Sequence, residues 1–265
     1  MQVIWALCLI ISFLFWSGEA MAGELSDRLA NFSHWAKLTS VRPAMGDLVY
    51  PDWIEGSWEV KSTLVDLAAP LAPDIVTPGF EGNRQYLNQP ISFKVRFVRE
   101  RKPVTAFKIF PKTLSKSTAV VADRAFNGLN LAKAYLGEAV LSVKVDPDSP
   151  NRQITFLRGK CSFDTLCDRQ LISTVTARAK ETTPDGEFIA TEVFQQFFKS
   201  TGRPYFNTVE STTAYRKLSQ ANPAIEADQV TAVYLSPQDP NYFTAGSRPV
   251  ALYRYQLEFF QESGL

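Results

Sequence analysis

The 265-residue sequence predicts an all-β fold built mainly from antiparallel strands. The first observation is that apolar and polar residues alternate with a period of two in about ten segments, as in strands with one face inward and one face toward water. The second is that short connections separate these segments and leave little room for the crossover helices that parallel strands require. A barrel or sandwich is therefore expected, rather than a parallel α/β sheet.

The expected strands share this alternation, or a short apolar run bounded by turn residues. They are Ser57–Asp66, Ile91–Val98, Val104–Phe110, Glu138–Val145, Gln153–Arg158, Leu171–Ala179, Glu187–Phe198, Thr208–Lys217, Val230–Leu235 and Val250–Phe260. Turn signals lie at Pro184-Asp185-Gly186 and at residues 145–151.

The composition is that of an ordinary globular protein, with 45% hydrophobic and 21% charged residues and a net charge of +1. These values exclude wholesale disorder and a protein with many membrane spans. A net charge near zero gives no strong field for nucleic acid, so no nucleic-acid partner is expected.

The N-terminus predicts an exported protein. Residues Val3–Trp16 are almost wholly apolar, and a small-x-small pattern ends at Ala22. We expect residues 1–22 to be a signal peptide cleaved after Ala22. The alternative is an uncleaved anchor, but the apolar run is shorter than the ~20 residues that a span needs. The expected organisation is then a helical segment at 23–48 and a single barrel domain at 49–265.

Two short helices are expected. The first, Glu24–Leu38, has Ser26 as its candidate cap and contains the single histidine, His34, which is more often a surface or packing residue than a ligand. Its apolar residues recur at helical spacing: Leu25, Leu29, Phe32 and Trp35. The second helix, Ala125–Tyr135, is expected to cap one end of the barrel.

Gly56-Ser57-Trp58 begins the first long strand. This G-x-W resembles the opening of a lipocalin-type barrel, so the architecture resembles a lipocalin-like barrel of about 8–10 strands. The resemblance implies that an arginine from a late strand packs on the Trp. Arg254 and Arg216 are the candidates, with Arg254 preferred.

A long proline-rich loop, Asp66–Pro90, interrupts the strand pattern. Loops of this length in a compact domain are usually functional or disordered, and its apolar residues need burial. We therefore expect an ordered lid over the barrel mouth. Its polar groups Asn83, Arg84 and Tyr86 would face a cavity or a partner.

Three motifs in this region resemble a known family. They are Tyr50-Pro51-Asp52-Trp53, Gly56-Ser57-Trp58 and Thr77-Pro78-Gly79-Phe80-Glu81-Gly82-Asn83-Arg84. The family is uncharacterised, and its members occur in cyanobacteria and in chloroplasts, where the thylakoid lumen is the suspected site. The resemblance implies lineage and compartment, and it implies no activity.

The sequence offers little for catalysis, and no catalytic residue, metal ligand or cofactor is expected. His34 is a poor base, and no Gly-rich phosphate loop or cluster of metal ligands is present. A carboxylate pair stays open as a third hypothesis, with these candidates: Asp66, Asp74, Glu81, Glu192 and Glu210. Cys161 and Cys167 remain after cleavage, and an even pair in an exported chain favours a disulfide.

The main functional hypothesis is a small hydrophobic ligand inside the barrel, such as a lipid, pigment or quinone. Its expected contacts are Trp58, Phe80, Asn83, Arg84, Tyr86, Phe93, Phe97 and Tyr255. The alternative is a partner that docks on a membrane-associated complex or on the membrane surface. Its docking face would be the basic cluster Lys94, Arg96, Arg99, Arg101 and Lys102, although a solvated, charge-balanced face is the simpler interpretation.

Overall fold

The computed structural model describes residues 23–35, 40–77, 79–101, 118–162, 165–199, 204–220 and 222–262. The strands are β1 (Arg42–Pro43), β2 (Gly56–Ala68), β3 (Pro90–Arg101), β4 (Thr118–Ala122), β5 (Val140–Asp146), β6 (Ser149–Ser162), β7 (Thr165–Thr182), β8 (Phe188–Lys199), β9 (Tyr205–Lys217), β10 (Ile225–Tyr234) and β11 (Ala251–Gln261). The α-helices are α2 (Glu24–Ala30), α3 (Phe80–Asn83), α4 (Arg124–Leu136) and α5 (Tyr242–Ala245). Single 3-10 turns are η1 (Phe32–His34), η2 (Asp52–Ile54), η3 (Arg84–Tyr86) and η4 (Gly137–Ala139). The expected signal peptide and the expected strand at 104–110 lie outside the described residues.

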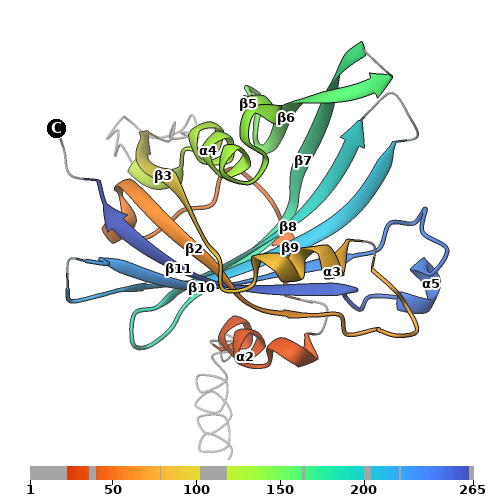
Figure 1. The fold of residues 1–265 in the computed structure, drawn as a ribbon. Coiled ribbons are helices and arrows are strands. Elements are labelled where there is room, and N and C mark those ends of the chain that lie inside the picture. Colours follow the sequence, from red (N-terminus) through yellow and green to blue (C-terminus); the bar gives the residue numbers. More distant parts are fainter. Residues whose placement is uncertain are drawn as a thin grey trace, which may run out of the picture.

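The strands form one antiparallel sheet that curls into a half-barrel (Figure 1). Neighbouring strands follow the order β4-β3-β2-β11-β10-β9-β8-β7-β6-β5, and β1 pairs with β7. The first long strand, β2, pairs with the last strand, β11, as at the seam of an up-and-down barrel. A closed barrel would also pair the two end strands of the sheet, but here the strand order ends at β4 on one side and at β5 on the other. The predicted all-β, antiparallel fold is thus confirmed.

Helix α4 lies across this opening (Figure 1). It follows β4 in the chain, precedes β5, and packs against β3, β5 and β6. The backbone N–H of Arg96 donates to Oδ1 of Asn127 at 2.7 Å, and Nδ2 of Asn127 donates to the Arg96 carbonyl at 3.1 Å. Asn127 therefore bonds the edge of β3 much as a neighbouring strand would.

The other side of α4 approaches β6 closely. A Cβ atom on Gly128 would lie 2.7 Å from Nε2 of Gln153, so glycine permits this contact without displacing the amide. The helix expected at Ala125–Tyr135 is therefore present, and it closes the open side of the half-barrel.

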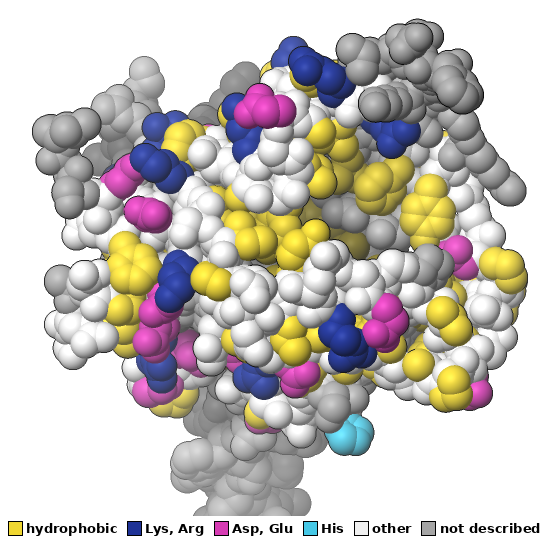
Figure 2. Space-filling view, viewed as in Figure 1, with side chains coloured by type: hydrophobic (Ala, Val, Ile, Leu, Met, Phe, Trp, Pro, Cys, Tyr) yellow, Lys and Arg dark blue, Asp and Glu magenta, His cyan; other side chains and the backbone are white. Residues whose placement is uncertain are grey.

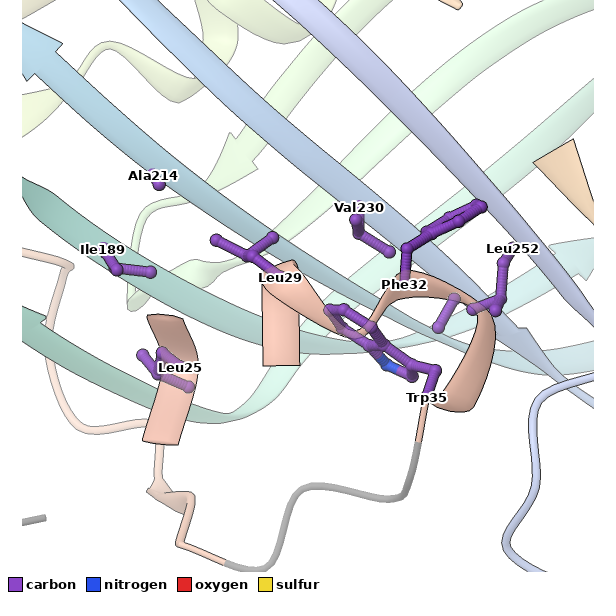
Figure 3. Packing of buried hydrophobic residues seen from close by; sticks show 9 residues of the cluster. Leu25, Leu29, Phe32, Trp35, Ile189, Ala214, Val230 and Leu252 are labelled. Carbon is purple, nitrogen blue, oxygen red and sulfur yellow. The ribbon is translucent and has the colours of Figure 1, made fainter. Parts of the chain in front are cut away.

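Helix α2 packs on the outer, convex face of the sheet (Figure 3). Four buried side chains from this segment contact the sheet: Leu25, Leu29, Phe32 and Trp35. They lie against Ile189, Ala214, Val230, Ala232 and Leu252. Each large apolar side chain buried in this way contributes about 1.5–3 kcal/mol relative to full exposure.

The start of α2 differs from the expectation. The backbone N–H groups of Leu25 and Ser26 donate to the carboxylate of Glu181 at 3.2 and 3.0 Å. The Ser26 cap was therefore a wrong prediction, because an acid from β7 fills the capping role and the helix begins before Ser26. The helix also ends at Ala30 and continues only as η1.

Trp58 is buried at the start of β2. Its Nε1 donates to the Ile54 carbonyl at 2.8 Å, and its ring packs edge-on against Phe259 with the centroids 6.4 Å apart. The Trp of the G-x-W motif thus fixes η2 against the sheet and belongs to the core.

The expected arginine on this Trp was a wrong prediction. Arg254 lies on the outer face, where it pairs with Asp228 at 2.5 Å, and Arg216 pairs with Glu226 at 2.8 Å. Side chains alternate along β11, so Arg254 shares the α2 side with Leu252, whereas Trp58 faces the concave side.

Within the part of the chain that the structure describes, no helix combines the length and the apolarity needed to cross a bilayer.

Candidate ligand-binding cavity

The concave face of the sheet and α4 line a cavity of 370 Å³ that is open to solvent on one side. In the view of Figure 2, hydrophobic side chains gather around a hollow between α4 and α3. Most of the apolar lining comes from β2, β3 and β11, through Val60, Phe93, Val95, Phe97, Leu257 and Phe259. These positions are spaced by two along each strand, which places them on one face.

Helix α4 supplies the opposite wall. Leu131 and Tyr135 line the cavity from positions four residues apart, which share one face of a helix. Their side chains remain 42% and 45% exposed, so they lie at the mouth rather than in the core.

The proline-rich segment covers one end of the cavity. Asn83 and Tyr86 line a small extension of 60 Å³ together with Tyr135 and Tyr255. Nδ2 of Asn83 lies 2.9 Å from the hydroxyl of Tyr253 on β11, and this hydrogen bond holds the segment against the sheet. The segment therefore shares the roof with α4, which sequence reasoning expected only as an end cap.

Five of the eight sequence-predicted contacts lie at the cavity or its extension. Phe93, Phe97 and Tyr255 line the main volume, and Asn83 and Tyr86 line the extension. β3, β11 and the proline-rich segment, all of which the sequence predicted to contact the ligand, therefore lie around the same cavity.

The other three predicted contacts lie elsewhere. Trp58 is in the core, and Phe80 is buried against Leu67 and Ala251. Arg84 pairs with Glu81 on the surface at 2.8 Å. Trp58 on β2 is covered by Phe259, and the turn formed by α3 and η3 brings Asn83 and Tyr86, but not Phe80 or Arg84, to the extension.

Sequence reasoning missed Tyr50 and Tyr215, which line the deep part of the cavity. Their rings lie 6.0 Å apart at an interplanar angle of 84°. Both rings lie deep in the molecule but keep some accessible surface, because they face the cavity. The only sequence signal was the Tyr50-Pro51-Asp52-Trp53 motif.

Burial keeps these phenols protonated. It raises the pKa of Tyr215 to about 12, although a hydrogen bond with Thr213 lowers it. Burial, followed by the neighbouring Tyr215 and Glu192, raises the pKa of Tyr50. Burial also raises the pKa of Tyr255. These hydroxyls are therefore neutral hydrogen-bonding groups at physiological pH.

A buried ionic network lies beside Tyr50. Arg124, at the start of α4, pairs with Asp47 at 2.6 Å and with Glu192 at 2.9 Å. Arg178 pairs with the same Glu192 carboxylate at 2.8 Å. Burial lowers the pKa of Arg124, but Glu192 and Asp47 raise it by more. Two cations and two anions thus compensate each other and anchor the N-terminus of α4.

The five candidate carboxylates do not converge. Glu192 is part of this inner network, whereas Glu210 lies under α2 and pairs with Arg28. Glu81 is on the surface with Arg84, and Asp66 and Asp74 are exposed. The described residues also contain no group of three or more His, Cys, Asp or Glu side chains arranged to hold a metal ion.

The described members of the basic cluster all have acidic partners. Lys94 pairs with Glu262, and Arg96 pairs with Asp123. Arg99 pairs with Asp52 and Glu55 at 3.1 and 2.6 Å. The side chain of Arg101 and all of Lys102 lie outside the described residues, as do the side chains of the predicted disulfide, Cys161 and Cys167.

A larger hollow of 810 Å³ lies between α2, residues 40–49 and β7. Its lining combines charged side chains, including Glu24, Arg42 and Glu181, with apolar side chains such as Leu25 and Met45. This hollow lies between α2 on the outer face of the sheet and the segment that leads to Tyr50 at the interior cavity. The smaller interior cavity has the aromatic lining and the convergent hydroxyls that are typical of a ligand site.

The matched family model is described as "Domain of unknown function (DUF6816)" and covers residues 43–263, which include β2 to β11 and the cavity. No match was found among curated proteins or among solved structures. The matched region begins after α2 and contains the strands of the half-barrel. The chain belongs to the DUF6816 family.

Proposed function

We propose that the protein binds an apolar or amphipathic small molecule inside the half-barrel. The observation that carries this proposal is the 370 Å³ cavity between the concave sheet and α4. Ligand pockets begin at about 300 Å³ and are mostly apolar, with a few polar groups. The lining of Phe93, Phe97 and Phe259 with deep tyrosine hydroxyls matches this description.

Binding would be driven by burial of apolar ligand surface, at about 25 cal/mol per Å² before the costs of association. The mouth supports the same proposal. Tyr86, Leu131 and Tyr135 are each between 42% and 45% exposed, and a ligand seated between them would cover part of this surface.

The proposed location is outside the cytoplasm, in a thylakoid lumen or a periplasm, after cleavage behind Ala22. The apolar run before Ala22 and the Thr77–Arg84 motif support this location. N-terminal sequencing of the mature protein from its native source should begin at Gly23. An intact Met1 would contradict the proposed cleavage.

The docking alternative has less support. The described basic residues Lys94, Arg96 and Arg99 already pair with acids, so little uncompensated charge remains there to attract an anionic surface. We therefore place the functional site in the cavity.

The test is a fluorescence titration of the purified protein with N-phenyl-1-naphthylamine, a neutral apolar probe that brightens when it leaves water. We expect saturable binding at one site, and organic extraction of natively purified protein should release a small molecule. A probe signal that does not saturate, together with an empty extract, would contradict the proposed function.

A further inference from the structure

The cavity has an unusual lining for a site that would take a fatty acid or a phospholipid. None of the described residues that line the cavity or its extension is Asp, Glu, Lys, Arg or His. The polar groups are hydroxyls and amides. In the main volume they come from Ser62, Asn127, Gln229, Thr231 and the tyrosines, and in the extension from Ser62, Asn83, Gln89 and the tyrosines. An anionic ligand buried here would lose its hydration and meet no cation on the lining.

The nearest buried cations are not available to such a ligand. Arg124 is bonded to Asp47 and Glu192, and Arg178 is bonded to Glu192 and to Oδ1 of Asn151 at 2.6 Å. To bind a carboxylate, either arginine would have to leave a partner that is itself buried. The network thus neutralises its own charge and presents none to the cavity.

The remaining groups select for a ligand with neutral acceptors. Tyr50 and Tyr215 line the deep end with their rings 6.0 Å apart, and Nε2 of Gln229 donates to the hydroxyl of Thr231 at 3.3 Å. Around them, aromatic rings from β3 and β11 make flat walls, which favour stacking or edge contacts with another ring.

We infer that the ligand is uncharged and carries a carbonyl or hydroxyl group on a flat ring, and that this ring lies at the deep end of the cavity against Tyr50 and Tyr215. This inference rests on the proposed function. A hydrocarbon tail on such a ring would extend toward the mouth at Leu131 and Tyr135, where the lining is partly exposed.

The test uses two compounds that share a ring system and differ in charge. 2-Methoxy-1,4-naphthoquinone is neutral, and 2-hydroxy-1,4-naphthoquinone is ionised at neutral pH. Each is titrated into the protein bound to N-phenyl-1-naphthylamine, and displacement is followed by fluorescence after correction for absorbance. We expect the neutral compound to bind at least about tenfold more tightly, and the gap to narrow when lower pH protonates the hydroxy compound.

A second comparison tests whether the hydroxyls of Tyr50 and Tyr215 bind the carbonyl groups of the ligand. In the double variant Tyr50→Phe with Tyr215→Phe, the rings remain and only the hydroxyls are lost. We expect this variant to lose most of the preference of the wild type for 2-methoxy-1,4-naphthoquinone over 2-methoxynaphthalene, which lacks the carbonyls.

The outcomes separate the two proposals. Equal or tighter binding of the ionised compound, with the probe still bound at one site, overturns the neutral-ligand inference and leaves the proposed function standing. An unchanged carbonyl preference in the double variant overturns the placement at Tyr50 and Tyr215. Failure of the probe and of both quinones to bind overturns the proposed function itself.

Discussion

Glu192 illustrates how single residues hold the inner end of the half-barrel. Its carboxylate accepts hydrogen bonds from both Arg124 and Arg178, and the three side chains are only 12–13% exposed. Attraction between buried charges offsets their loss of hydration only while every partner is present.

The variant Glu192→Gln should therefore destabilise the protein by about 3–5 kcal/mol, because it leaves buried arginine charge without its shared partner. The free energy of unfolding from urea titration measures this. Glu258→Gln is the matched control: it breaks a pair with Lys61 whose side chains are 45% and 36% exposed. The control should cost no more than about 1 kcal/mol. An equal loss of free energy of unfolding in the two variants would show that the buried network stabilises the protein no more than an exposed ion pair does.

Tyr215 predicts a dependence on alkaline pH. Its pKa is raised to about 12 in the folded protein, whereas a tyrosine in an unfolded chain has a pKa of about 10. The folded state therefore holds the proton longer, and the stability that this group contributes is complete below pH 10 and is lost as pH rises toward 12. The variant Tyr215→Phe should flatten the fall in the free energy of unfolding across this window. An identical slope in wild type and variant would contradict the assignment.

At the scale of elements, α4 is the part that turns a curled sheet into a container. It is held at its start by Arg124, along β3 by Asn127, and against β6 by the absence of a side chain at Gly128. Its last turns, by contrast, carry partly exposed apolar residues such as Leu131 and Leu136.

The variant Asn127→Ala should loosen this wall. It removes both hydrogen bonds to the backbone of Arg96, at a cost of about 1–3 kcal/mol, so amide hydrogens of α4 should exchange faster and the neutral probe should bind more weakly. Asn130→Ala is the control on the same helix, because the amide of Asn130 donates to the Phe126 carbonyl within α4, whereas Asn127 bonds to β3. Slower or unchanged exchange in the Asn127 variant would show that the sheet closes without this contact.

At the scale of the whole molecule, the strand pattern was predictable because alternation is a local property. The segment Ile91–Val98 was expected as a strand, and β3 extends over Pro90–Arg101. The turn at 184–186 joins β7 to β8, with Gly186 at φ 88°. β4 was missed because Ala119, Val120 and Val121 are buried in succession and do not alternate.

The features that needed distant partners were not predictable. Glu181 caps α2 although it lies more than 150 residues away in the sequence, and no local sequence pattern predicts this contact. Tyr50 and Tyr215 meet only after the sheet has curled and the segment before β2 has entered it. The assignment of Arg254 to the wrong face has the same origin, because the facing of a strand depends on its bulges and neighbours.

The central claim is that the half-barrel is hollow and that its interior binds the ligand. Thr231 lines the cavity from β10, and Thr63 lies on the outer face of β2, between the inward-facing Ser62 and Leu64. The variant Thr231→Phe fills the interior, and Thr63→Phe places the same ring outside.

The decisive measurement is the affinity of both variants for N-phenyl-1-naphthylamine, with circular dichroism to show that each keeps its strand content. We expect Thr231→Phe to weaken binding by at least about tenfold, and Thr63→Phe to bind as the wild type does. Full affinity in a folded Thr231→Phe protein would contradict the claim that the ligand lies inside the half-barrel.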